Sequence, residues 1–211
     1  MIELNSIAKG VEAGDEMVKA AAVELIMAQP ICAGKYMVLA SGDVDSAQRA
    51  SEVGKEVAGE FLVDDFVIAN VHPSVFPALT ATTRIHDVDS LAVVETFSVV
   101  SAIMAADAAV KAADVDIIEI RCATGLGGKS FFYLTGDVAS INSAVQAGLD
   151  LLQGTGLVLS HVIIPSPSKN IIRFVFRDRA FIPHEYMLWY QTEGNHQFIH
   201  HCFWNPAQTR A

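Results

Sequence analysis

The sequence predicts an α+β protein of two tandem ferredoxin-like domains, each with the element order β-α-β-β-α-β. Three observations lead to this fold class. The chain repeats itself at an offset of 92 to 94 residues. Both copies show the same order of strand and helix patterns. The length of 211 residues, with 52% hydrophobic side chains, suffices for two domains with their own cores.

The repeat is visible at several places along the chain. Residues 3–8 align with residues 95–100, and residues 15–26 with residues 107–118, an offset of 95 − 3 = 92. Gly42-Asp-Val aligns with Gly136-Asp-Val, so two further residues lie in an intervening loop of the second copy, 136 − 42 = 94. After that, residues 71–74 align with residues 163–166, where the offset returns to 92. Because the two copies stay aligned over most of each half of the chain, the repeat predicts tandem domains.

The elements of the first copy follow from residue patterns in chain order. An Ala-rich helical pattern follows a short strand, and the next strand stops before Pro30, which cannot donate to a ladder. After a small-residue loop and another strand, Asp43 or Asp45 caps the second helix. The expected elements are strand 2–6, helix 11–21, strand 23–28, loop 31–34, strand 36–40, helix 46–58 and strand 66–71.

The second copy predicts the same order of elements. They are strand 93–98, helix 102–113, strand 115–122, strand 130–135, helix 139–152 and strand 157–164. Pro73, Pro77 and a Thr-rich stretch mark residues 74–91 as a connector. We therefore expect a first domain with connector over 1–87, a second domain over 88–176, and a C-terminal tail over 177–211 that the repeat does not explain.

Charge and composition exclude several classes of partner. With 24 acidic against 14 basic residues and a net charge of −10, the chain lacks the basic surface that nucleic acids or anionic membranes require. Its most apolar window, residues 91–110, is interrupted by Glu95 and Asp107, so no membrane span is expected. No signal peptide is recognisable at residue 1, and three widely spaced cysteines suit a reducing compartment. We expect a cytoplasmic protein.

Neither copy carries the groups of an enzyme. No nucleophile with its base, carboxylate pair or metal cluster shares an element, and His72 has no partner histidine at ligand spacing. The loop 125–129 has glycines and Lys129, but it lacks the spacing of a phosphate-binding loop and lies between two strands. Its counterpart is the small-residue loop 30–35. Such loops are either tight strand connections or places where copies approach one another around a rotation axis.

The repeated motifs resemble those of bacterial microcompartment shell proteins. Residues 15–21 and 107–113 are similar to the signature helix of that family, and both Gly-Asp-Val sequences are similar to its next helix start. Residues 4–10, 31–35, 69–75, 94–99 and 125–129 extend the resemblance to about residues 1–170. Two unpermuted copies resemble the tandem-domain, trimer-forming class.

The resemblance implies a structural protein of a microcompartment shell. Three copies would form a pseudohexameric homotrimer that tiles with other shell proteins around an enzyme cargo, with an encapsulated redox enzyme as a further candidate partner. Lys19 and Lys111 match the lysine at the tile edge. The pore loops would consist of Ile31, Cys32, Ala33, Gly34, Gly125, Leu126, Gly127 and Gly128.

The resemblance further implies that Cys32 ligates a [4Fe–4S] cluster, one per trimer, for electron transfer across the shell. Three copies supply three thiolates where a cubane usually has four cysteine ligands, so the fourth iron needs another ligand. Two alternatives to the cluster remain open: a cluster-free trimer whose pore conducts small metabolites, with Cys32 packed as a small hydrophobe, and a ferredoxin-like small-molecule sensor trimer or minor enzyme. The tail could separately hold a metal through His196, His200, His201 and Cys202. Cys122 is expected to be a buried core thiol.

Overall fold

The computed structural model describes residues 1–85 and 87–175. The predicted tail, with its four candidate metal ligands, lies outside the described residues. Residues 1–167 form one compact unit, and a second unit starts at Ser168. None of the helices in the described ranges is long and apolar enough to cross a membrane.

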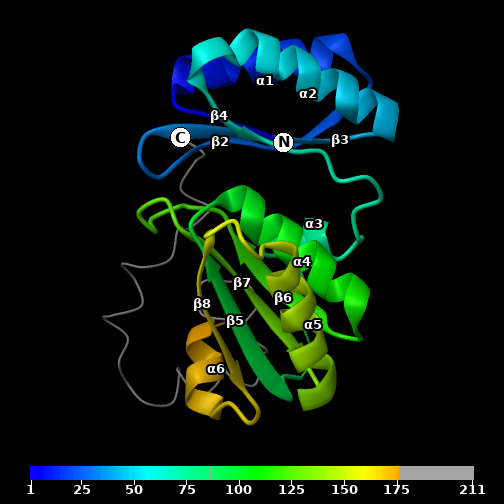
Figure 1. Ribbon diagram of the computed structural model, residues 1–211, viewed down its shortest axis with the longest axis vertical. Helices are drawn as coiled ribbons and strands as arrows, with labels where there is room; N and C mark the ends of the chain where they lie inside the picture. The colour runs from blue at the N-terminus through cyan, green and yellow to red at the C-terminus, as the bar shows by residue number, and fades with distance from the viewer. Residues whose placement is uncertain (86, 176–211) are drawn as a thin grey trace, which may run out of the picture. The chain divides into compact units, whose positions relative to one another are not determined.

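Each repeat folds as a four-stranded antiparallel sheet with two helices on one face (Figure 1). The first sheet has the strand order β2-β3-β1-β4, and the second has the matching order β6-β7-β5-β8. The first repeat contains β1 (Ile2–Leu4), α1 (Ile7–Ala20), β2 (Glu24–Ile31), β3 (Lys35–Ser41), α2 (Val44–Ala58), a 3-10 turn (Gly59–Phe61) and β4 (Leu62–Asp65). The second contains β5 (Ser90–Thr96), α4 (Val99–Ala112), β6 (Asp116–Arg121), β7 (Ser130–Gly136), α5 (Val138–Leu151) and β8 (Val158–Ile164). The predicted fold class is confirmed.

Side-chain caps fix where the helices begin. The hydroxyl of Ser6 accepts the N–H of Lys9 at 3.3 Å, and Ser98 caps α4 in the same way. These caps start both helices three to four residues before the predicted positions, at Ile7 and Val99. Asp43 caps α2 through the N–H of Ser46 at 2.9 Å, which decides between the two predicted caps.

The first sheet is buried on both faces. Tyr36 and Val38 pack with Ile2, Leu4 and residues of α1 and α2 in one apolar cluster. Met37 and Leu39, which alternate with them along β3, belong to a second cluster that also contains residues of α4. The far face of the first sheet is therefore joined to the second repeat in one continuous core.

The prediction of a final strand over residues 66–71 is wrong. β4 occupies Leu62–Asp65, and its ladder with β1 ends at two hydrogen bonds between Met1 and Phe66, of 2.8 and 3.0 Å. Residues 67–71 lie beyond the last pairing position of β1, so they have no ladder to join.

Strand register also corrects the sequence alignment of the repeats. Asp65 lies opposite Ile2, and His161 lies opposite Val94, so the last strands correspond at an offset of 161 − 65 = 96. The match of residues 71–74 with residues 163–166 is therefore not a structural equivalence.

Both final strands are followed by a short helix. The predicted connector contains α3 (Val75–Leu79), and α6 (Lys169–Val175) follows β8. The two helices start at an offset of 169 − 75 = 94, and the carbonyl oxygens of Ser74 and Ser168 accept the N–H groups of Ala78 and Ile172 at these starts.

Glycines at equivalent positions let the two helices of each repeat pack closely. A Cβ on Gly148 of α5 would lie 2.9 Å from the carbonyl oxygen of Ala105 in α4, and one on Gly54 of α2 would lie 2.7 Å from Met17 Sδ. These glycines correspond at 148 − 54 = 94. Gly14 of α1 differs, because a Cβ added there would lie 3.5 Å from its nearest neighbour, a methyl group of Val38.

We predict that Gly148→Ala lowers the free energy of unfolding by about 1–3 kcal/mol, since a backbone carbonyl cannot move aside for the added carbon. Gly14→Ala is the matched control and should be neutral or stabilising by up to about 1 kcal/mol, through helix propensity. Chemical denaturation of both variants measures the difference. Equal stability of the two variants would contradict the close packing of α4 and α5.

Candidate pore and assembly sites

The two predicted pore loops connect corresponding strands and contain left-handed backbone. Residues 32–34 join β2 to β3, and residues 122–129 join β6 to β7. Gly34 has φ of 73°, and Gly125, Gly127 and Gly128 have φ between 62° and 89°. A side chain at these positions would strain the backbone although nothing stands within 4 Å of the added carbon. Glycine is thus favoured by conformation, although Ala33 and Ala123 in the same loops also have positive φ.

The two loops meet within one chain. The N–H of Cys32 donates to the carbonyl oxygen of Ala123 at 2.8 Å, and the N–H of Gly125 donates to Cys32 Sγ at 2.9 Å. Residues from both predicted pore loops are therefore brought together around one sulfur.

Backbone amides around this sulfur favour its thiolate. The N–H of Leu126 makes the largest contribution to a lowered pKa of Cys32. Partial desolvation acts in the opposite direction, and the N–H groups of Gly127, Gly125 and Gly128 add to the lowering. Successive N–H groups pointing at one anion form a backbone nest. Cys32 is half-exposed, so its sulfur is accessible as well as activated.

Within residues 1–85 and 87–175, one chain brings too few donor side chains together for a metal centre. Among the described residues no group of three or more histidine, cysteine, aspartate or glutamate side chains could hold a metal ion. Cys32 does suit an iron–sulfur cluster as one thiolate ligand, because N–H donors to ligand sulfurs are a feature by which proteins tune such clusters. The residues therefore fit the implied cluster only if several copies bring their Cys32 side chains to one place.

Cys122 is the buried thiol that the sequence predicts. It is 5% exposed, and burial, with the charges of Glu119 and Glu3, raises its pKa to about 12. A thiol this protected and this difficult to ionise is unsuited to ligation.

An ion pair at the base of each loop was not predicted. Lys35 lies 2.7 Å from the carboxylate of Glu3, and Lys129 lies 2.6 Å from that of Glu95. The sequence signal was present, because the two lysines correspond at 129 − 35 = 94 and the two glutamates at 95 − 3 = 92. Each pair ties the strand that leaves a loop to the first strand of its repeat.

The two predicted edge lysines have different surroundings. Lys19 contacts Asp15 at 2.5 Å and Glu16 at 3.0 Å, and its side chain is 60% exposed. Lys111 contacts Asp107, which is buried, and its own side chain is 38% exposed.

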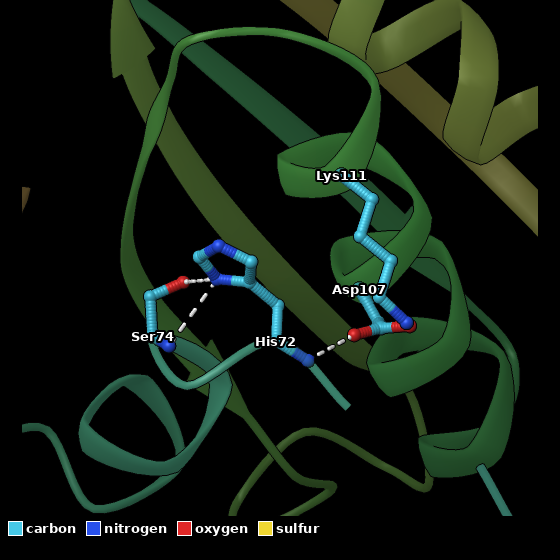
Figure 2. Close-up of polar contacts among 4 residues, drawn as sticks. All are labelled: His72, Ser74, Asp107 and Lys111. Carbon is cyan, nitrogen blue, oxygen red and sulfur yellow. Dashed lines mark hydrogen bonds and ion pairs between the residues drawn. The ribbon is translucent and has the colours of Figure 1, made fainter. Parts of the chain in front are cut away.

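Asp107 also fixes the segment that leaves the first repeat. Its Oδ1 accepts the backbone N–H of His72 at 2.7 Å, as Figure 2 shows beside Lys111. The ring Nδ1 of His72 lies 2.8 Å from the hydroxyl of Ser74 and accepts the backbone N–H of Ser74 at 3.3 Å. His72 thus shapes a turn, and among the described residues it belongs to no group of three or more side chains that could hold a metal ion.

Comparison with known proteins identifies the family. The model of the BMC domain matches residues 1–71 and again residues 90–167. The chain is a bacterial microcompartment shell protein. This shell protein is 40% identical over 173 residues to the bacterial microcompartment shell protein PduT of Citrobacter freundii, covering 82% of the chain and 94% of that relative.

Solved structures agree with this family and with two domains per chain. A crystal structure of a microcompartment protein from Desulfitobacterium hafniense has a TM-score of 0.79 and 48% identity, covering 82% of this shell protein and 96% of that chain. A fused permuted hexameric shell protein of the RMM microcompartment has a TM-score of 0.54 at 22% identity, covering 72% of this chain and 83% of its own, which shows the fold alone. The major carboxysome shell protein CsoS1A of Halothiobacillus neapolitanus is 39% identical over 87 residues, 39% of this chain and 87% of its own length.

We predict that the cysteines differ sharply in reactivity towards iodoacetamide. In a Cys202→Ser background treated with chelator, Cys32 should be alkylated in the folded protein and Cys122 only after unfolding. Because the folded pKa of Cys32 is lowered, its thiolate persists to lower pH than in the unfolded chain. Mass spectrometry of the labelled peptides measures both rates. Faster labelling of Cys122, or a Cys32 profile shifted to higher pH on folding, would contradict the nest.

Proposed function

We propose that this shell subunit acts as a homotrimeric, pseudohexagonal tile whose pore brings together Cys32 from three copies to hold one [4Fe–4S] cluster. The family supports the coarser part: the chain is a structural shell subunit, not an enzyme, in a family whose members assemble with other shell proteins. The finer part depends on one observation, the accessible Cys32 sulfur held in a nest of backbone N–H groups.

The proposal assigns a role to Cys32, to Ala123 and to the loop of residues 125–128. The Cys32 thiolate binds, and the 125–128 loop orients it and stabilises its negative charge through N–H groups. The bond between Cys32 N–H and Ala123 fixes the loop of the first repeat on that of the second. A bound cluster would supply one-electron transfer between the two faces of the shell. A redox enzyme inside the compartment is the natural partner for such transfer.

A second function, conduction of small metabolites through a cluster-free pore, is favoured by the exposed loop glycines. Gly34, Gly125 and Gly127 are exposed and carry no side chain that would narrow an opening. In this case the N–H groups around Cys32 would attract anions, and the thiol would add only a small polarisable surface.

Iron content separates the two functions. After anaerobic purification or reconstitution, we expect about four iron and four acid-labile sulfide per trimer, as a cubane requires. Cys32→Ser should lose them, whereas Cys202→Ser and Cys122→Ala should retain them. Absence of iron after reconstitution would favour the metabolite pore. Retention of iron by Cys32→Ser would show that the ligands lie elsewhere.

The edge role of the lysines is testable by sheet formation. We predict that Lys19→Asp abolishes two-dimensional sheets in electron microscopy without changing the mass of the soluble assembly, because it adds a carboxylate beside Asp15 and Glu16. Lys111→Gln should also reduce the formation of two-dimensional sheets. Arg49→Asp, at an exposed position of α2, is the control for a reversed charge and should leave sheets intact. Intact sheets from both lysine variants would refute the edge assignment.

A further inference from the structure

The first repeat contains a cavity at the end of its sheet, with a volume of about 220 Å³. The interior of its lining is apolar and buried, because Met17 and Val75 are each 1% exposed and Ile103 is 2% exposed. Val44 and Asn70 also line the cavity and are exposed, so they mark its opening to solvent. Neither pore loop contributes a lining residue, which separates the cavity from the site around Cys32.

Two small side chains leave this space unfilled. Helices α2 and α5 begin at an offset of 138 − 44 = 94, and the same offset relates β3 to β7. At this offset, Ala40 and Ala47 of the cavity lining correspond to Leu134 and Ile141. The two larger side chains are both 0% exposed, so they fill the core of the second repeat. The first repeat therefore lacks their branched carbons at the equivalent place.

Strand pairing leaves the same end of the first sheet open. In the second repeat the pairing of β5 with β7 continues as far as Ser90 opposite Gly136. In the first repeat the pairing of β1 with β3 ends at Ile2 opposite Val38. Residues 40–42, which line the cavity, therefore have no pairing partner in β1. The cavity occupies a place that side chains and a longer strand fill in the second repeat.

The cavity has no charged side chain among its described lining residues, which include no aspartate, glutamate, lysine, arginine or histidine. The ionisable group that remains is the amino group of Met1, which donates to the carbonyl oxygen of Phe66 at 2.8 Å. Burial lowers the pKa of this amino group to about 6, although the charge of Asp65 acts in the opposite direction. The lining is therefore mostly uncharged at pH 7. An ion that entered the cavity would lose hydration without gaining a charged partner, so the lining selects against ions.

Polar side chains occupy the more exposed part of the lining. Ser41 is half-buried and Asn70 is exposed, and neither side chain has a hydrogen-bond partner within residues 1–85 and 87–175. Ligand cavities are commonly apolar with a few polar groups that fix the orientation of the ligand. An apolar interior with two free polar side chains nearer the solvent suits a molecule with an apolar body and one polar end.

We propose that this cavity is a binding site for a small uncharged molecule with an apolar body and one hydroxyl or carbonyl end. An apolar cavity of about 150 Å³ holds one benzene molecule, so this cavity suits a ligand of roughly six to nine non-hydrogen atoms. The apolar body of the ligand displaces water that the lining holds weakly, which favours binding. This binding site lies apart from the pore and goes beyond the proposed function.

Hexan-1-ol tests the site in the unmodified, assembled protein. Methionine methyl groups labelled with carbon-13 report the titration by NMR, because Met1 and Met17 line the cavity. Met37 is fully buried outside the cavity lining and serves as the internal control. We expect saturable shifts at Met1 and Met17 and none at Met37. Hexanoate should bind more weakly by about tenfold or more at pH 7, because its carboxylate is charged.

The side chains of the second repeat provide a variant that fills the cavity. Ala40→Leu combined with Ala47→Ile should weaken binding of hexan-1-ol by about tenfold or more and raise the melting temperature, because it removes unfilled space from the core. Ala139→Ile, at an exposed position of α5, is the control and should bind hexan-1-ol as the unchanged protein does. Circular dichroism reports folding of each variant. Ala47→Val, which fills less space, replaces the double variant if that variant does not fold, and it should weaken binding to a smaller extent.

Several results would overturn the proposal. Absence of a saturable shift at Met1 and Met17 would show that the cavity does not bind the alcohol. An equal shift at Met37 would show general loosening of the core in place of a site. Undiminished binding by a folded, cavity-filled variant would place the ligand elsewhere, and equal affinity for hexanoate would contradict the uncharged class of ligand. None of these results depends on iron content, so failure of this proposal is distinguishable from failure of the proposed pore function.

Discussion

The contact between the far face of the first sheet and α4 is the interaction on which the rest of the structure depends. A β-sheet with helices on one face leaves its other face open unless something covers it. Met37 and Leu39 on that face, together with α3, share a core with Val99 and Ile103. Burial of such side chains contributes about 1.5–3 kcal/mol each. The contact also brings Cys32 to Ala123 and His72 to Asp107.

This one contact explains why a repeated sequence has unequal halves. α4 is apolar along its length, with nine buried residues, whereas α1 buries four and carries charged residues between them. The difference follows from what each helix faces in the chain. Val99 and Ile103 of α4 are covered within the chain, whereas the corresponding Ile7 and Val11 of α1 are exposed. The sequence difference between α1 and α4 thus follows their different burial within the chain.

The sequence was sufficient for the repeat, the element order and the fold class, because these follow from periodicity and turn residues. It failed at residues 66–71, which are apolar enough for a strand but have no partner ladder beyond Met1. Strand pairing depends on residues distant in sequence, so a local pattern could not exclude that strand. The sequence indicated Cys32 and the glycine loops as candidate residues. It did not indicate the nest of N–H groups around the sulfur, because Cys32 and Gly125 are 93 residues apart in the sequence and no local motif links them. The different settings of Lys19 and Lys111 also required coordinates, since both follow an aspartate at the same spacing.

The proposed function makes one central claim, that Cys32 side chains from different copies meet at one pore. Spin labels attached to Cys32 in a Cys122→Ala, Cys202→Ser background test this most directly, by electron paramagnetic resonance of the cluster-free assembly. The account predicts that dipolar coupling between labels broadens the spectrum of the fully labelled protein. This broadening should disappear when labelled subunits are diluted with unlabelled ones. Labels that show no coupling in an assembly confirmed as trimeric would contradict the claim.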